Sequence, residues 1–254
     1  MQRACPACFH QLCDALAGIC KNGKRDTEER GRVKVLTKRL RTRIYTHHLP
    51  LFLLASASTA ALYVTRPYRD VITKLSFATA YPALVLLAAT LLIGPWNAFR
   101  KQRIPVSSDL RRDIGIWAGI VGIFHAVVGQ NVHLRGRPWL YYVYEHSKHG
   151  PRGLRHDLFG FNNFTGLAAT VVLIVLFATS NDWYLRRLGT RQWKKMQRWN
   201  YVCFALTGAH ALGFQIMERQ ATPFFVTALI CVAITGLFQF FGFLLYRRGF
   251  KERF

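Results

Sequence analysis

The sequence predicts an all-α membrane protein, a bundle of six transmembrane helices. Of its 254 residues, 51% are hydrophobic, and most of these are gathered into long apolar blocks. Each block is long enough to cross the hydrocarbon core of a bilayer as a helix, and the connections between the blocks are polar and basic. The six predicted spans cover residues 49–65, 75–96, 114–131, 163–180, 199–217 and 223–246.

The distribution of positive charge predicts the orientation of these spans. The chain carries 35 Lys and Arg against 12 Asp and Glu, and 26 of the 35 fall on the side that holds both termini. Because the loops of membrane proteins carry their excess of Lys and Arg in the cytoplasm, both termini are predicted to be cytoplasmic. Basic residues beside spans are also attracted to anionic headgroups, so the charge indicates membrane lipid as a partner and no nucleic acid.

The chain is expected to contain three parts. Residues 1–48 form a basic, cysteine-containing cytoplasmic segment, 49–246 the six-helix domain, and 247–254 a short basic cytoplasmic tail. No cleavable signal peptide is expected, because the first part holds charge throughout and no sustained apolar core.

Two histidines stand near the middle of spans that are predicted to run in the same direction. His125 lies about 13 residues beyond Arg112, and His210 about 12 beyond Arg198, so the two imidazoles are expected at similar depth. An ionisable side chain deep in a membrane helix is costly and is by default a candidate functional residue. Axial histidine holds the iron of many haem proteins, and two imidazoles at one depth could bind the two faces of one haem. The pair therefore predicts a transmembrane electron carrier.

Small residues flank both histidines on their own helix faces. They are Gly122 and Gly129 around the first histidine, and Thr207 and Gly213 around the second. Such residues leave room for a flat cofactor beside each ring. The alternative is that they only let helices pack closely, with each histidine hydrogen-bonded across the helix interface.

Two stretches of this sequence, RRDIGIWAGIVGIFH at 111–125 and FATSNDWYLRRLGTRQWKKMQRWNYVCFALTGAH at 177–210, resemble the ferric reductase-like transmembrane domain family. The resemblance extends over residues 75–246 and points to the MsrQ/YedZ branch, the haem-binding membrane subunits of bacterial periplasmic methionine sulfoxide reductase systems. It implies a six-helix bundle in the bacterial inner membrane that binds b-type haem through histidines on the third and fifth spans. These histidines would be His125 and His210.

The chain departs from the members of this family that bind two haems. Those members place a second histidine about 13 residues away on each ligand helix, where this chain has Arg112 and Gln197. One haem b is therefore expected. By similarity to six-transmembrane metalloreductases, which hold a flavin at the inner position, Arg112, Gln197 and Arg198 could line a site for FMN, FAD or an acidic donor protein. The alternative is that the basic residues here only set the topology.

Four cysteines near the N-terminus form a second candidate site. They follow the pattern C-x2-C-x4-C-x6-C and are Cys5, Cys8, Cys13 and Cys20. Four soft ligands this close together could bind zinc or an iron–sulfur cluster. The spacing matches no known ferredoxin pattern, however, and free thiols are expected in a reducing cytoplasm.

The longest outer connection, roughly residues 132–162, is rich in imidazole and phenol groups. It contains His133, His146, His149 and His156 together with Tyr141, Tyr142 and Tyr144. Imidazoles suit transition metals, so the loop could bind iron or copper, but such residues also form interfacial belts without a further role. His133 could also contact a haem propionate, together with Arg135 or Arg137.

These observations together predict an oxidoreductase component that relays single electrons. A cytoplasmic flavin or flavoprotein would be the donor, because no glycine fingerprint for a nucleotide is found in the chain. An outer-face protein or ferric iron would be the acceptor. Two alternatives stay open: a quinol-linked cytochrome b subunit of a larger membrane complex, and a haem-free structural membrane subunit.

Overall fold

The computed structural model describes residues 40–68, 70–100, 108–134, 137–145, 153–218 and 222–251. The chain divides into two compact units, Met1–Pro50 and Leu51–Phe254. In the first unit the described residues form one helical stretch that contains the π-helix η1 (Ile44–His48). The four N-terminal cysteines lie outside the described residues, so their predicted metal site is a matter of sequence alone.

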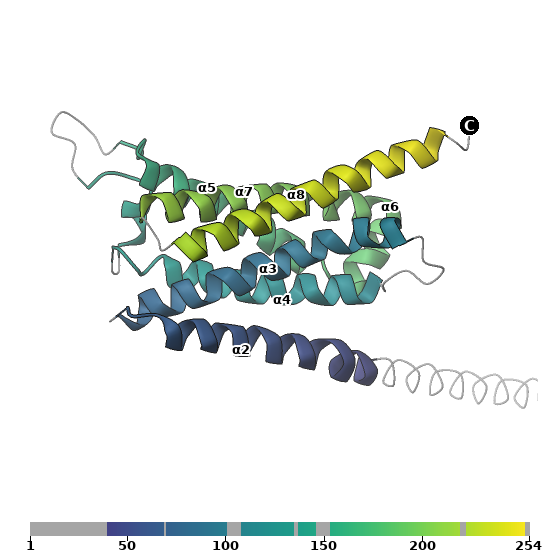
Figure 1. Ribbon diagram of the computed structural model, residues 1–254, viewed down its shortest axis with the longest axis horizontal. Helices are drawn as coiled ribbons and strands as arrows, with labels where there is room; N and C mark the ends of the chain where they lie inside the picture. Colours follow the sequence, from purple (N-terminus) through teal and green to yellow (C-terminus); the bar gives the residue numbers. More distant parts are fainter. Residues whose placement is uncertain are drawn as a thin grey trace, which may run out of the picture. The chain divides into compact units, whose positions relative to one another are not determined.

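The second unit is helical, in agreement with the predicted all-α class (Figure 1). Among the described residues, the one β-type pairing is an isolated bridge between Val143 and Leu154. The helices are α2 (Leu49–Thr65), α3 (Val71–Arg100), α4 (Ser108–Gly129), the 3-10 helix η2 (Pro138–Tyr141), α5 (Leu158–Ala178), α6 (Asp182–Gln197), α7 (Trp199–Met217) and α8 (Thr222–Lys251).

In the described ranges, five helical segments are long and apolar enough to cross a membrane, and they overlap five of the six predicted spans. They cover Leu40–Thr65, Val71–Asn97, Asp109–Gly129, Leu158–Ala178 and Pro223–Leu245. The protein is therefore an integral, multi-pass membrane protein. Because a chain in hydrocarbon must satisfy its backbone polar groups internally, apolar blocks of this length form helices.

The sixth predicted span, 199–217, coincides with α7 and is not among these five. Its 19 residues are enough for a span, but several polar side chains lower its apolar character. Asn200 donates a hydrogen bond to Thr90 Oγ1 (2.7 Å), and Gln215 donates one to the Tyr81 hydroxyl (2.6 Å). Because α3 provides acceptors for these two amide N–H groups, α7 can carry polar residues and still pack inside the bundle. The count of six spans stays a prediction.

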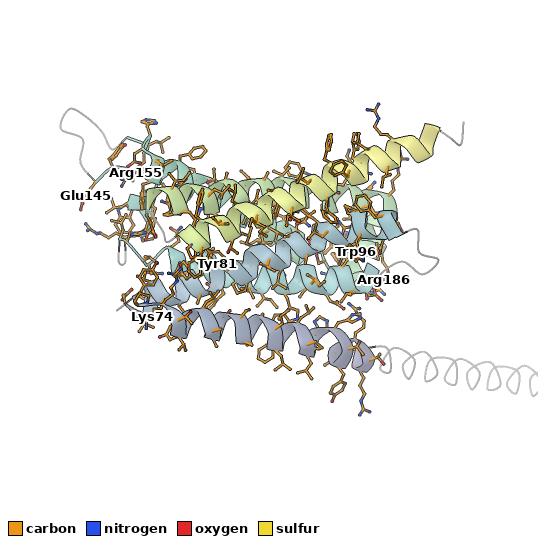
Figure 2. The ribbon with its side chains drawn as sticks, viewed as in Figure 1. Lys74, Tyr81, Trp96, Glu145, Arg155 and Arg186 are labelled. Carbon is orange, nitrogen blue, oxygen red and sulfur yellow. The ribbon has the colours of Figure 1, made fainter. Side chains whose placement is uncertain are left out.

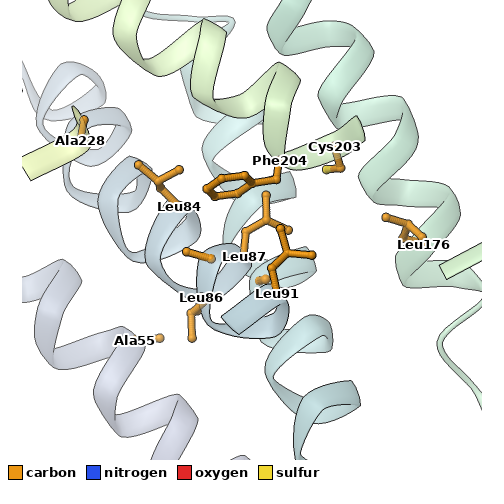
Figure 3. Close-up of a cluster of buried hydrophobic side chains, with 11 residues drawn as sticks. Ala55, Leu84, Leu86, Leu87, Leu91, Leu176, Cys203, Phe204 and Ala228 are labelled. Carbon is orange, nitrogen blue, oxygen red and sulfur yellow. The ribbon is translucent and has the colours of Figure 1, made fainter. Parts of the chain in front are cut away.

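The core of the second unit lies where α3 meets α4, α7 and α8, and where α5 packs on α7. Figure 3 shows Leu84, Leu87 and Leu91 of α3 against Phe204 of α7, with Leu176 of α5 nearby. Large apolar side chains on the outer faces of the helices stay exposed, as expected for surfaces that contact lipid tails.

The bundle has two ends. One end, called the α6 end, holds α6, which carries Arg186, and the C-terminal part of α8 (Figures 1 and 2). The opposite end, called the Arg155 end, carries Arg155 and Glu145 (Figure 2). The sequence predicted only a polar connection at 181–198, whereas α6 is a helix that begins at the N-cap Asn181 and is interrupted at Gly189. Gly189 has φ 73°, a left-handed conformation that favours glycine.

A cavity with paired histidines as the candidate functional site

His125 of α4 and His210 of α7 face each other in the interior of the bundle. Their ring centres lie 6.3 Å apart, and the ring planes are inclined by 75°. Two metal–imidazole bonds of about 2.0–2.1 Å, with roughly 1.1 Å more from each nitrogen to its ring centre, put two ligands of one metal about 6.3 Å apart. The separation in this protein therefore fits two imidazoles on opposite sides of a single metal atom.

Backbone carbonyls orient both rings. Nδ1 of His125 lies 2.9 Å from the carbonyl oxygen of Ser76, and Nδ1 of His210 lies 2.7 Å from that of Asn162. Since a carbonyl oxygen only accepts hydrogen bonds, each Nδ1 must carry the proton and donate it. Each Nε2 then keeps its lone pair, and neither has a hydrogen-bond partner in the described part of the chain. A metal-binding histidine commonly has this arrangement of an anchored Nδ1–H and a free Nε2.

A cavity of about 540 Å³ borders both histidines. Its wall comes from α3, α4, α5 and α7, and it is largely apolar, with residues such as Leu84, Leu87, Ala118, Leu173 and Ile174. Cofactor sites are typically apolar cavities of about 300–1,000 Å³ with a few polar groups that fix orientation. The cavity therefore has the size and the character of a cofactor site.

The small residues predicted beside the histidines have different roles. Gly122 lines the cavity, and it also lets α4 and α5 pack closely, because a Cβ there would lie 2.7 Å from Cδ2 of Leu173. Gly129 and Thr207 line the cavity as well. Gly213 does not: a Cβ there would collide with Oδ1 of Asn162, so this glycine lets α5 and α7 approach each other. The packing alternative therefore holds for this position.

The sequence analysis missed two residues of α5 that hold His210 in place. The Asn162 carbonyl anchors its ring, and a Cβ on Gly166 would lie 2.5 Å from its Nδ1. The side chain of Asn162 is fully buried, and its amide atoms have no hydrogen-bond partner among the described residues. A polar residue and a glycine in an otherwise apolar helix were the available signals, but nothing in the sequence connects them to a histidine more than 40 residues further along the chain.

Polar pairs form the rim of the cavity toward the Arg155 end. Gln130 donates a hydrogen bond to the Tyr142 hydroxyl (2.9 Å), and burial raises the pKa of Tyr142. His133 lies 3.3 Å from a carboxylate oxygen of Glu218 and stacks on Phe214. These groups place hydrogen-bonding atoms at one side of an otherwise apolar space.

The structure brings together only part of the predicted outer His and Tyr cluster. His133, Tyr141 and Tyr142 line the cavity, whereas His156 donates its backbone N–H to the Tyr144 hydroxyl (3.3 Å). Arg135, His146 and His149 lie outside the described residues, and Arg137 pairs with Glu145. Within the described ranges no three His, Cys, Asp or Glu side chains are grouped as a metal site.

The predicted inner site lies near the α6 end. Arg112 donates a hydrogen bond from Nη1 to Asp182 Oδ1 (2.5 Å), which links α4 to α6. Its Nε is buried without a partner, and so is Nε2 of Gln197, while Arg198 is exposed where α6 ends and α7 begins. Among the residues that the structure describes, these two buried N–H donors therefore have no acceptor.

The fold and this cavity define a multi-pass membrane protein with a paired-histidine site of cofactor size.

No protein-family model matches the chain. The chain is 32% identical over 135 residues to the protein-methionine-sulfoxide reductase heme-binding subunit MsrQ of Yersinia pseudotuberculosis serotype O:1b (strain IP 31758), which is 53% of this chain and 59% of the relative. The MsrQ protein of Yersinia pestis (strain Pestoides F) is also 32% identical over 135 residues, 53% of this chain and 58% of that protein. The chain thus spans less than two thirds of the length of these relatives.

Proposed function

We propose that this chain is a membrane electron carrier that binds one b-type haem between His125 and His210. The observation that carries the proposal is the pair of imidazoles 6.3 Å apart on the wall of one cavity, each with Nδ1 anchored. The name of the similar MsrQ proteins, a heme-binding subunit, supports the choice of cofactor. When bound, haem would supply a centre that accepts and releases single electrons.

The residues of the chain would orient and tune this centre. Hydrogen bonds from Nδ1 of His125 and His210 to backbone carbonyls hold the rings and make each Nε2 a better donor to iron. Two axial imidazoles leave no open coordination position, so the pair suits electron relay and not oxygen binding. The apolar wall excludes water, and the polar rim with Gln130, Tyr142 and Gln215 offers hydrogen bonds to carboxylates such as haem propionates.

We also propose that electrons enter at the α6 end. The buried donors of Arg112 and Gln197, with the exposed Arg198 beside them, would contact the phosphate or ring oxygens of FMN or FAD, or a flavoprotein. With both termini cytoplasmic, this end would face the cytoplasm at the bacterial inner membrane. The acceptor would then lie at the outer face, as a methionine sulfoxide reductase by analogy with the names of the relatives, or as ferric iron.

The ligand assignment is tested by haem quantitation in purified variants. We expect about one haem b per chain by pyridine haemochrome in the wild type, and none in His125→Ala or His210→Ala. His156→Ala is the control, because it removes a histidine that does not line the cavity and should keep the haem. Normal b-type spectra in both single variants would show that the ligands are wrong, and a colourless wild type would favour the haem-free structural subunit. Co-purification with a respiratory complex would favour the quinol-linked subunit.

The N-terminal segment needs a separate measurement. Zinc or iron binding by Cys5, Cys8, Cys13 and Cys20 is proposed from their spacing alone. Elemental analysis of the purified chain should show this metal in addition to haem iron. Replacement of all four cysteines by serine should remove the extra metal and leave the haem spectrum unchanged.

A further inference from the structure

Arg66, in the connection between α2 and α3, has an unusual environment at the end of the bundle opposite α6. Its guanidinium carbon lies 3.4 Å from the ring centre of Phe224 on α8 and 4.0 Å from that of Phe77 on α3. The two rings meet edge to face, with their centres 5.2 Å apart. The aromatic faces attract the cation and fix its position, but they accept none of its N–H hydrogen bonds in the plane of the guanidinium.

Within the described part of the chain, the guanidinium of Arg66 has no counter-charge. Nε and Nη2 are buried and have no hydrogen-bond partner, and no ion pair to Arg66 is present among the described residues. Arg155, at the Arg155 end, differs because it pairs with both carboxylate oxygens of Asp157 (3.1 and 2.6 Å). A buried cation whose donors lack acceptors is costly. An anion with two or more oxygens would satisfy the planar fork that Arg66 presents.

The position of Arg66 indicates where this anion comes from. The residue lies between two candidate membrane spans, Leu40–Thr65 and Val71–Asn97, so it stands at the level where a bilayer has its headgroups. It does not line the histidine cavity; Phe77 and Tyr81 do, and Phe77 contacts the guanidinium directly (Tyr81 is labelled in Figure 2). Val64 of α2 and Val226 of α8 are exposed apolar residues on two of the adjoining elements and suit acyl chains.

We propose that Arg66 binds the phosphate of a phospholipid headgroup at this face, beside Phe77 of α3 and Phe224 of α8. The phosphate oxygens accept hydrogen bonds from the unpaired N–H groups, and the lipid tails cover the apolar surface of α2 and α8. Arg66 itself does not line the cavity, so we expect lipid binding there to be independent of haem binding. It predicts one tightly held lipid per chain, in contrast to the rapidly exchanging lipids around the rest of the bundle.

The test uses the full chain purified in detergent, with phosphatidylglycerol as the probe. We expect native mass spectrometry to show one retained lipid and the thermal unfolding temperature to rise as phosphatidylglycerol is added. Arg66→Gln should weaken this binding at least tenfold, and Arg66→Lys should weaken it less, because lysine keeps the charge and loses the fork. Arg187→Gln is the matched control: its guanidinium also lies over an aromatic ring, Trp183 at 5.1 Å, but on the exposed surface of α6.

Three results would overturn the proposal. The first is equal lipid retention in Arg66→Gln and the wild type. The second is an equal rise in unfolding temperature with inorganic phosphate alone, which would show a free anion site in place of a lipid site. The third is loss of haem from Arg66→Gln with lipid binding unchanged, which would assign the guanidinium to the ligand of the cavity. If Arg66→Gln does not fold, the same comparisons are made with Arg66→Lys, where undiminished lipid binding contradicts the role of the fork.

Discussion

A single methyl group on α5 should disturb the candidate haem ligand on α7. In Gly166→Ala the new Cβ would lie 2.5 Å from Nδ1 and 2.7 Å from Cε1 of His210. An ordinary contact at such a Cβ is 3.4–4 Å, so the ring or the helix must move by about 1 Å. The hydrogen bond of 2.7 Å from Nδ1 to the Asn162 carbonyl would be lost or bent by such a movement.

The expected loss of haem affinity in Gly166→Ala can be estimated from how metal sites respond to a displaced ligand and how cores respond to an added methyl group. Metal–ligand distances tolerate deviations of about 0.2 Å, far less than the movement required. Loss of the hydrogen bond that orients a ligating histidine typically lowers metal affinity about 10–100-fold, and overpacking of a core costs about 1–3 kcal/mol. We therefore expect Gly166→Ala to bind haem about 10–100-fold more weakly than the wild type, with a lower unfolding temperature.

The assay is a haem titration of the purified apoprotein in detergent, followed by absorbance. Gly115→Ala and Gly236→Ala are the matched controls, because a Cβ on Gly115 meets only Thr90 Cγ2 at 3.8 Å and one on Gly236 meets nothing within 4 Å. Alanine is favoured over glycine inside a helix by about 0.5–1 kcal/mol, so both controls should be as stable as the wild type or slightly more stable. Wild-type haem affinity in Gly166→Ala would refute the idea that α5 positions the ring of His210.

Three further predictions concern α5 and its N-terminus. Gly213→Ala should destabilise the protein by about 1–3 kcal/mol, since its Cβ would overlap the Asn162 side chain; thermal unfolding in detergent measures this. The Arg155 guanidinium holds the pKa of the Asp157 carboxyl below its usual range, so the stabilising charge is present at neutral pH and is lost as the pH falls through that lowered pKa. Asp157→Asn should therefore lower the unfolding temperature at pH 7, by an effect of about 0.2–1 kcal/mol, and the difference from the wild type should shrink below about pH 4; a constant difference contradicts the pairing. Gly160→Ala should also unfold at a lower temperature, because its Cβ would lie 2.9 Å from the Arg155 carbonyl oxygen, and an unchanged unfolding curve would show that the α5 N-terminus adapts freely.

The predicted spans were accurate where the apolar blocks end sharply. The boundaries of 199–217 coincide with α7, and 65 is the end of α2, but the helical stretch that includes α2 begins earlier than the predicted 49, at Leu40. Likewise α3 extends from Val71 to Arg100, beyond the predicted 75–96. The polar turns at the ends of α3 continue the helix, because a helix does not need apolar residues outside the hydrocarbon core. The helix α6 was missed for the same reason: it is polar, and apolar block length was the signal used.

Of the residues that form the candidate site, the sequence could predict only the two central histidines. His125 and His210 are conspicuous because they are ionisable side chains inside apolar blocks, and the charge pattern predicted that their helices run in parallel. The backbone carbonyls of Ser76 and Asn162 position the two imidazoles. Because every residue has a backbone carbonyl, the residue type at these two positions gives no signal of this role.

The sequence by itself determined that this is a multi-pass helical membrane protein with two histidines buried in it. Hydrocarbon permits few backbone structures, so long apolar blocks dictate helices whatever their neighbours are. Only the tertiary structure decided which faces of those helices meet. That choice places Gly166 against His210, encloses the cavity, and puts Arg66 between Phe77 and Phe224, because each contact depends on the rotation and separation of helices that are distant along the chain.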